Sequence, residues 1–425
     1  MKRVAKAVGE GKKKRVLGDV EIISAEEYEG LDVNAKVEVI RALIPLGLKA
    51  VMEMLDEEVT ALAGRRYSRG EGRPGLARYG SNPGSVRLAG QRVRMPIPRV
   101  RNLRSNVEVP LQGLEALRGT GEVDEALLRR VLLGLSCRNY EGAAEALPGA
   151  IGLSGSSVSR QFVKASAARL REFQERDLSE LDIVVMVLDG KTFAEDTMVI
   201  GLGMTMEGRK VPLGFVQTGT ENARVLTAFL EGLVERGLCI DEGVLVVIDG
   251  GKGLCAAVDR GLGEKAVVQR CQWHKRENVV SYLPKWEQAE WRRRLQRAYE
   301  KPTYTEAKSA LLKVREELAG RNESAAASLD EGFEETLTLH RLGLFKELGR
   351  SLKTTNCLES IISMVELRCG KVSYWRNSSQ KHRWLGAALL EIEPRLHRIH
   401  GYKYLPQLRS ALQEELGIKV RHEVA

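Results

Sequence analysis

Three acidic residues stand in settings that suit metal-dependent chemistry on phosphodiesters. Asp189 and Asp249 each follow an apolar run, 183–188 and 244–248, which is typical of a buried strand. Glu359 falls in the first turn of an expected helix. Carboxylate oxygens are the ligands that Mg²⁺ prefers, and a pair of Mg²⁺ ions supports the cutting and joining of phosphodiesters. The three acids therefore predict a catalytic metal site for nucleic-acid chemistry.

Each acid also has a simpler interpretation. Asp-Gly, which occurs at 189–190 and 249–250, is a common turn dipeptide, so either aspartate alone could mark only a turn. A site is favoured because both dipeptides follow buried strands that we expect to be neighbours. Glu359 could instead cap its helix, and Glu366, seven residues further on, occupies nearly the same helix face. Glu366 therefore stays the alternative third ligand.

A Cys-x-x-His pair, Cys271 and His274, lies at the expected start of a helix. Two ligands do not complete a tetrahedral zinc site, and the sequence has no Cys-x-x-Cys or His-x₃-His pair to add the others. Zinc is therefore not predicted. The pair could support the carboxylates, contact DNA, or form a buried hydrogen-bonded pair with no catalytic part.

The elements that must position the acids follow an informative order. They are strands 183–189, 198–206 and 211–217, helix 223–236, strand 244–249, helix 252–261 and strand 266–270. Three antiparallel strands, a crossover helix and a parallel strand are the order of a ribonuclease-H-like α/β core with a mixed sheet. In that fold the first and fourth strands are neighbours, which would bring Asp189 and Asp249 together.

Positive charge is concentrated in one segment. The chain carries +9 overall, but residues 64–104 hold eleven arginines against one acid, Glu71, so that this segment alone carries 11 − 1 = +10. Such a segment, interspersed with Gly and Pro, suits an extended arm lying along DNA phosphates. Alternating apolar and basic residues over 85–101 predict a basic β-ribbon within it. A flexible, solvated loop is the alternative.

A helical region precedes this arm. We expect a basic tail over residues 1–20. Residues 34–63 carry apolar residues at helical spacing that could pack against a second copy of the chain. Pro45 and Gly47 could kink or split this helix.

A helix-turn-helix is predicted after the arm. Residues 140–147 and 156–163 have helical patterns separated by a break, with Val158 and Phe162 facing inward. Helix pairs of this kind also occur in proteins that do not bind DNA. The second helix would offer four polar side chains to a groove: Ser157, Ser159, Arg160 and Lys164.

Composition sets the class of protein. With 425 residues, of which 43% are hydrophobic, the chain can fold two or more domains. The six cysteines have no paired spacing, and no leader or run of eighteen apolar residues occurs. We expect a soluble protein of a reducing cytoplasm with no membrane partner.

Taken together, the motifs resemble the Mutator-type transposases of bacterial insertion sequences, a branch of the DDE transposase and integrase superfamily. The matching stretches lie in the core and the residues that follow it, whereas the N-terminal third matches only in general organisation. They are residues 188–191, 208–210, 213–215, 220–222, 235–238, 248–254, 269–271, 274–275, 278, 355–356 and 359–360.

The resemblance implies that the three acids are the DDE triad and that the Cys-x-x-His pair is the family signature. It also implies an α-helical insertion domain between the second and third acids, and residues 281–349 have a helical composition. The expected reaction is in-line attack without a covalent protein intermediate, with two Mg²⁺ ions held by the triad and Mn²⁺ as a substitute.

Double-stranded DNA is the expected partner, both as the element's terminal inverted repeats and as the target. Because two DNA ends must be brought together, we also expect a homodimer, associated with DNA in the bacterial cytoplasm. Trp286 and Trp291 could stack on unpaired bases, although core packing is the commoner role for a helical tryptophan. The residues predicted to contact DNA are Arg65, Arg66, Arg92, Arg94, Arg99, Arg101, Ser157, Ser159, Arg160, Lys164, Arg292, Arg293, Arg368, Lys371, Trp375 and Arg376.

These predictions divide the chain into six regions. They are the basic tail and first helical segment (1–63), the arginine-rich DNA-binding arm (64–124), the helix-turn-helix-like domain (125–180), the first part of the catalytic core (181–280), the α-helical insertion domain (281–350), and the completion of the core with the C-terminal helices (351–425).

Two other functions fit parts of this pattern. The chain could be a DNA-binding regulator whose catalytic domain is vestigial, but the three intact acids argue against that. It could be a nuclease or resolvase of the same fold that cuts without joining. The arm and the helix-turn-helix favour a protein that must find defined DNA ends.

Overall fold

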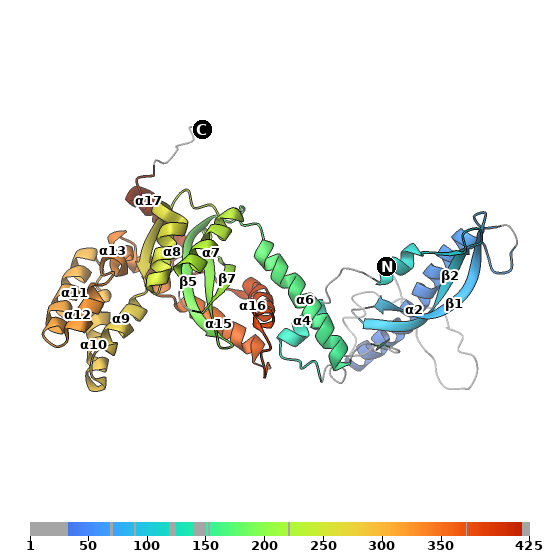
Figure 1. Ribbon diagram of the computed structural model, residues 1–425, viewed down its shortest axis with the longest axis horizontal. Helices are drawn as coiled ribbons and strands as arrows, with labels where there is room; N and C mark the ends of the chain where they lie inside the picture. Colours follow the sequence, from blue (N-terminus) through green and yellow to red (C-terminus); the bar gives the residue numbers. More distant parts are fainter. Residues whose placement is uncertain are drawn as a thin grey trace. The chain divides into compact units, whose positions relative to one another are not determined.

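A computed structural model describes residues 33–68, 71–88, 91–118, 125–138, 150–151, 154–219, 222–370 and 372–418 (Figure 1). The chain forms two compact units. The first comprises Met1–Leu127 and Leu135–Phe162, and the second comprises Leu128–Gly134 and Val163–Ala425. The basic tail predicted for residues 1–20 lies outside the described residues.

The first unit is built on one long helix and a β-sheet. Helix α2 (Val33–Ala63) continues through Pro45 and Gly47 as a single helix, so neither residue splits it. Its buried residues Val51, Leu55 and Val59 are spaced four apart and therefore share one helix face, which packs on the apolar face of the sheet.

The sheet of this unit contains a long antiparallel hairpin. Strands β1 (Leu76–Leu88) and β2 (Gln91–Asn102) pair along their lengths, and β2 also pairs with β3 (Val107–Val109) and β4 (Ala150–Ile151). The ribbon predicted for 85–101 is therefore part of a longer hairpin. Side chains alternate across it, with apolar residues buried and basic residues outside. Helix α3 (Gln112–Arg118) follows.

The region predicted as a helix-turn-helix is described in part. The first predicted helix, 140–147, lies outside the described residues, and helix α4 (Glu125–Leu132) comes before it. The second is α6 (Gly155–Glu175), which is much longer than the predicted 156–163. Val158 and Phe162 are buried, in agreement with the inward orientation expected of them.

The second unit contains a five-stranded mixed sheet of order β7-β6-β5-β8-β9. Its strands are β5 (Ile183–Phe193), β6 (Asp196–Thr205), β7 (Lys210–Thr218), β8 (Val244–Ile248) and β9 (Ala266–Arg270). The first three are antiparallel, and β8 pairs in parallel with both β5 and β9. This arrangement is compatible with the predicted ribonuclease-H-like core.

Helices pack on both faces of this sheet. Leucines of α7 (Ala223–Glu235) and α8 (Lys252–Leu262) join Met186 and Leu188 of β5 in one apolar cluster. Asp189 alternates with Leu188 and therefore points to the other face. There α15 (Asn356–Cys369) packs near β5, followed along the chain by α16 (Ser378–Ile392) and α17 (Leu405–Glu415).

A helical domain is inserted between β9 and α15 (Figure 1). It has its own apolar core. Its helices are α9 (Gln272–Ser281), α10 (Lys285–Tyr299), α11 (Tyr304–Ala319), α12 (Glu323–Asp330), α13 (Thr338–Arg341) and α14 (Phe345–Leu352). Trp291 belongs to this core, whereas Trp286 is 81% exposed. No helix within the described ranges is long and apolar enough to span a membrane. All six cysteines are free thiols.

Candidate active site

Asp189 lies within a strand and not at its end, which corrects the sequence prediction. Strand β5 continues to Phe193 because β6 pairs with it over that length, with Phe193 opposite Asp196. The parallel partner β8 stops earlier, at Ile248 opposite Leu188. Asp189 is therefore the first residue of β5 beyond the parallel pairing, and its side chain is 2% exposed.

Asp249 follows β8 directly and begins a sharp turn. Its Oδ1 atom accepts a hydrogen bond of 2.9 Å from the Gly251 amide. Gly250, between them, has φ of 94°, a left-handed conformation that favours glycine. The turn leaves the Asp249 side chain half-buried, beside the start of α8.

Arg270, the last residue of β9, connects this turn to the insertion domain. Its Nη1 atom donates to the Gly250 carbonyl at 3.3 Å, and its Nε atom donates to Glu335. Glu331 lies 3.8 Å from Nη1. Arg270 is buried, and these acids raise the pKa of its guanidinium although burial opposes them. The loop after Asp249 is thus held by a cation whose acidic partners belong to the insertion domain.

Glu359 projects from the first turn of α15 toward β5. Its Oε1 atom accepts a hydrogen bond of 3.0 Å from the Lys191 ammonium. The same ammonium lies 3.4 Å from Oδ2 of Asp189. Lys191 therefore stands between a buried carboxylate of the sheet and a half-buried carboxylate of the helix.

The start of α15 is packed against the start of α9. Thr355 is the N-cap residue of α15, but its hydroxyl donates to the Cys271 sulfur at 3.9 Å instead of capping its own helix. The Gln272 amide also donates to the Lys353 carbonyl at 2.9 Å. Because Cys271 is the N-cap residue of α9, two helix N-termini meet beside the acids, where their dipoles favour negative charge.

His274 joins the carboxylates. One ligand atom each from Asp189, His274 and Glu359 lies within 4.8 Å of the others, a group that could hold a metal ion. No other such group of three occurs in the ranges that the structure describes, and Asp249 is not part of it. The sequence singled out His274 as a signature residue with several open roles, but it gave no sign that the imidazole lies beside Asp189 and Glu359.

Burial and neighbouring charges shift the pKa values of the site residues in different directions. Burial raises the pKa of Asp189, and Asp249 adds to this, whereas Lys191 and His274 act in the other direction. Burial would lower the pKa of His274, but Cys271 and the two aspartates raise it. Burial would raise the pKa of the Cys271 thiol, but its hydrogen bond with His274 lowers it.

The side chains of Asp189, His274 and Glu359 are chemically suited to bind a divalent cation. Oδ2 of Asp189 is buried and accepts no hydrogen bond from the described residues, and the Lys191 ammonium, 3.4 Å away, is its ion-pair partner. A buried anionic oxygen is costly unless a cation or a donor satisfies it, and a divalent ion could take that place. Nδ1 of His274 is also buried and has no hydrogen-bond partner among the described residues. Two carboxylates and one imidazole are ligands that Mg²⁺ or Mn²⁺ can accept, the imidazole suiting Mn²⁺ better.

Glu366, the alternative third acid, is placed differently. It lies two turns beyond Glu359 on α15, its side chain is exposed, and it does not belong to the metal-capable group. The structure thus brings Glu359 to the buried aspartate and leaves Glu366 on the surface.

The arginines of the arm fall into two groups. Arg65, Arg66, Arg92 and Arg94 are exposed, although Arg66 lies 3.5 Å from Asp56 and Arg92 donates to the Ser85 hydroxyl at 2.8 Å. Arg99 and Arg101 are half-buried and have partners of their own, which the charge count did not anticipate. Arg99 donates to both Glu108 oxygens at 2.9 Å, and Arg101 lies 4.2 Å above the Tyr79 ring and donates to Asn106.

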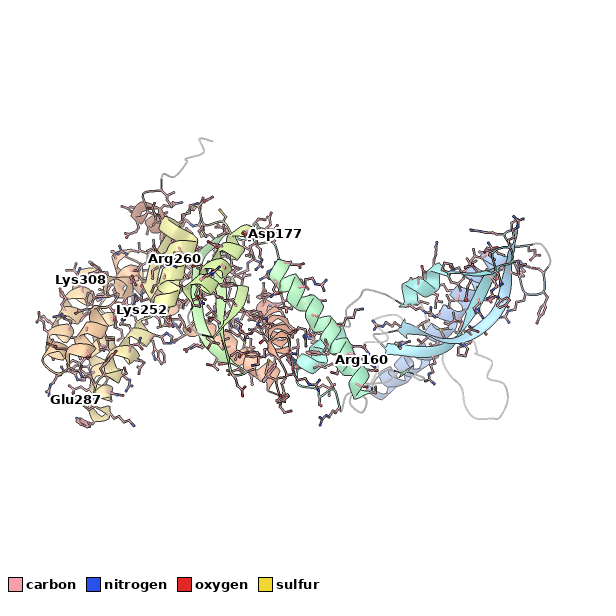
Figure 2. The ribbon with its side chains drawn as sticks, viewed as in Figure 1. Arg160, Asp177, Lys252, Arg260, Glu287 and Lys308 are labelled. Carbon is pink, nitrogen blue, oxygen red and sulfur yellow. The ribbon has the colours of Figure 1, made fainter. Side chains whose placement is uncertain are left out.

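The polar residues of α6 are largely accessible. Ser159, Arg160 and Lys164 are exposed, and Ser157 is half-buried, with its hydroxyl 3.5 Å from the Arg160 guanidinium. Figure 2 labels Arg160 on this helix. Arg160 and Lys164 lie on the side of α6 away from the buried Val158, and Ser157 and Ser159 flank that side.

The remaining residues predicted to contact DNA differ in their exposure and in their partners within the protein. Arg292 pairs with Glu277 at 2.8 Å, and Arg293 beside it is exposed. Arg368 donates to the Met364 carbonyl within α15. The Trp375 ring packs against Phe193 and Trp384, while Arg376 is exposed. Lys371 lies outside the described residues.

The chain thus combines a mixed sheet compatible with a ribonuclease-H-like core and a group of two carboxylates and one imidazole that could hold a metal ion. Comparisons with known proteins agree with this class. The sequence profile described as "Transposase, Mutator family" matches residues 14–397. Because the match spans most of the chain, the protein belongs to the Mutator family of transposases, which implies an enzyme that cuts and joins DNA strands. This confirms the resemblance found in the sequence.

Individual relatives are transposases of bacterial insertion sequences. The chain is 27% identical over 402 residues to the transposase for insertion sequence element ISRM5 of Rhizobium meliloti (strain 1021), covering 90% of this chain and 96% of the relative. It is 27% identical over 281 residues to the transposase for IS256 in transposon Tn4001 of Staphylococcus aureus, covering 63% and 69%. It is 29% identical over 296 residues to the transposase for IS1081 of Mycobacterium tuberculosis, covering 66% and 69%.

Proposed function

We propose that this protein is a DDE transposase that binds the terminal inverted repeats of an insertion sequence and catalyses divalent-metal-dependent strand cleavage and strand transfer. One observation carries the proposal. Oxygen atoms of Asp189 and Glu359 and a nitrogen of His274 converge within 4.8 Å, on the sheet face next to the turn that holds Asp249. This geometry supports the proposal because it gathers groups that could hold a metal ion from a strand, a helix and the start of the insertion domain.

Asp189, Asp249 and Glu359 would hold the metal, as Mg²⁺ ions with Mn²⁺ as a substitute. Two such ions, when bound, would supply Lewis-acid activation of the attacking water or DNA 3′-hydroxyl and would stabilise charge on the leaving oxygen. His274 is a further candidate ligand because one of its ring nitrogens lies within 4.8 Å of a carboxylate oxygen of both Asp189 and Glu359.

The other residues around the site position the acids. The sheet fixes Asp189 in a buried strand, and the Cys271–Thr355 contact fixes the first turn of α15, from which Glu359 projects. Arg270 holds the carbonyl of Gly250 and so restrains the turn that carries Asp249. Groups held in advance of the reaction need little reorganisation when charge develops at the reacting phosphate.

Double-stranded DNA is the proposed substrate. Exposed arginines on the hairpin and exposed polar residues on α6 supply positive charge and hydrogen-bond donors for phosphates and groove edges. We propose that the hairpin and α6 bind the terminal repeats, that the second unit with its insertion domain performs catalysis, and that a homodimer brings two ends together.

The test uses duplex DNA carrying the ends of the element and, separately, a target duplex. Wild-type protein with Mg²⁺ should nick the ends and join them to the target, whereas Asp189→Asn should bind the same DNA and do neither. End binding without nicking by the wild type would indicate a regulator. Nicking without joined product would indicate a nuclease of the same fold.

A further inference from the structure

Lys191 places a cation at the point where the proposed function requires a metal ion. It lies two residues after Asp189 on β5 and therefore on the same face of the strand. Its ammonium donates to Glu359 Oε1 at 3.0 Å and lies 3.4 Å from Asp189 Oδ2. The side chain is 27% exposed, so that the charge is partly shielded from water.

In the absence of metal, this ammonium offsets the unfavourable electrostatics of the two carboxylates. Two carboxylates that face one another in a partly buried site repel each other, and each loses hydration. A single cation between them relieves both costs. Lysine suits this task because its ammonium is a compact point charge on a flexible four-carbon stem, which can later turn aside.

We propose that Lys191 is an internal counter-cation that bridges Asp189 and Glu359 in the metal-free protein and is displaced when a divalent ion binds. The released ammonium then pairs with a phosphate of the DNA strand that enters the site. This inference rests on the proposed function, because it assigns the same two carboxylates to the metal. It adds a step in which loading of the metal makes a phosphate ligand available.

The displacement has a measurable consequence for metal affinity. In the wild-type protein the metal must replace a charge-assisted hydrogen bond, whereas in Lys191→Met the carboxylates have no cation to lose. The methionine keeps a long apolar stem in place of the lysine stem. Mn²⁺ should therefore bind Lys191→Met roughly tenfold more tightly or better than it binds the wild type.

The first experiment measures Mn²⁺ binding to the full-length protein by titration calorimetry. Lys313→Met is the matched control, because Lys313 is an exposed lysine of α11 in the insertion domain. It should bind Mn²⁺ as the wild type does. Equal or weaker Mn²⁺ binding by Lys191→Met would overturn the inference. If Lys191→Met does not fold, Lys191→Gln, which is neutral and can still donate a hydrogen bond, takes its place with the same expected direction.

Thermal unfolding gives an independent readout. Without metal, Lys191→Met should unfold at a lower temperature than the wild type, and saturating Mn²⁺ should raise its unfolding temperature by more. An equal Mn²⁺-induced rise in the two proteins would contradict the counter-cation role.

A second experiment tests the phosphate contact. DNA affinity is measured against salt concentration with Ca²⁺ in place of Mg²⁺, using a duplex that carries the element's end. The slope of log affinity against log salt should be smaller by about 0.9 in Lys191→Met, because one phosphate contact is lost. Identical slopes would overturn the phosphate step.

These outcomes separate the inference from the proposed function. If wild-type protein fails to bind Mn²⁺, or if Asp189→Asn binds it unchanged, the proposed metal site itself fails. If Mn²⁺ binding depends on Asp189 but is not tightened in Lys191→Met, only the role of Lys191 fails.

Discussion

Asp189 and Asp249 are the first residues beyond the parallel pairing of β5 with β8. That pairing ends where Leu188 of β5 lies opposite Ile248 of β8. The two aspartates are therefore neighbours at the edge of the parallel pairing, although their strands are separated by two antiparallel strands and a helix in the sequence. Glu359 reaches the same face of β5 from α15. The site thus depends on both the sheet register and the docking of one helix.

The choice of the third acid can be tested with two glutamine substitutions on one helix. Glu359→Gln should reduce Mg²⁺-dependent nicking of end DNA by about a hundredfold or more, because it removes an anionic carboxylate that would hold the metal ion. Glu366→Gln should keep nearly wild-type nicking, because its side chain is exposed and lies outside the group. Nicking retained in Glu359→Gln and lost in Glu366→Gln would reverse the assignment.

His274 should contribute to metal binding. His274→Gln should weaken Mn²⁺ binding by about tenfold or more, measured by calorimetry, because the site loses a nitrogen close to both carboxylates. His397→Gln is the matched control, since His397 is exposed near the C-terminal helix. Unchanged Mn²⁺ affinity in His274→Gln would restrict this residue to supporting Cys271.

Much of the second unit could be predicted from its sequence, because apolar runs bounded by turn residues report strands directly. The strand order then made Asp189 and Asp249 neighbours. The convergence of His274 with the acids could not be read in the same way. It depends on the contact between the starts of α9 and α15, through Cys271 and Thr355, which are 84 residues apart. Nothing in a local pattern reports such a contact.

The arginine-rich arm shows a second limit of prediction from the sequence. Charge counting treated all of its arginines alike, whereas β-sheet register decides which of them has an acid opposite. In the register of β2 and β3, Arg101 lies opposite Glu108. The ion pair with Glu108, however, is formed by Arg99, two residues earlier on β2. Arg92 and Arg94 lie beyond the end of β3 and remain exposed.

This difference predicts different salt dependences of DNA binding. Arg92→Ala and Arg94→Ala should each lower the slope of log affinity against log salt by about 0.9, if each arginine contacts one phosphate. Arg99→Ala makes the same change in charge but should alter the slope less, because its guanidinium is already paired with Glu108. Equal slope changes in all three variants would show that the ion pair does not withhold Arg99 from DNA.

The connection through Arg270 can be tested with two glycines of the insertion domain. Gly332 and Gly343 both have left-handed backbones, with φ of 63° and 70°. A methyl group on Gly332 would overlap the Arg270 guanidinium, whereas one on Gly343 would meet no atom within 4 Å. Gly332→Ala should therefore lower nicking well below the level of Gly343→Ala, at a temperature where both proteins are folded. Similar nicking by the two variants would argue that Arg270 does not position the Asp249 turn.

The central claim is that Asp189 and Glu359 hold a divalent metal ion. Anomalous diffraction from crystals of the full-length protein soaked in Mn²⁺ tests it most directly. The account predicts an anomalous peak within direct coordination distance of the carboxylates of Asp189 and Glu359, with Lys191 turned away from them. A Mn²⁺ peak held by other residues, or no peak at these carboxylates in crystals that bind Mn²⁺ elsewhere, would contradict it.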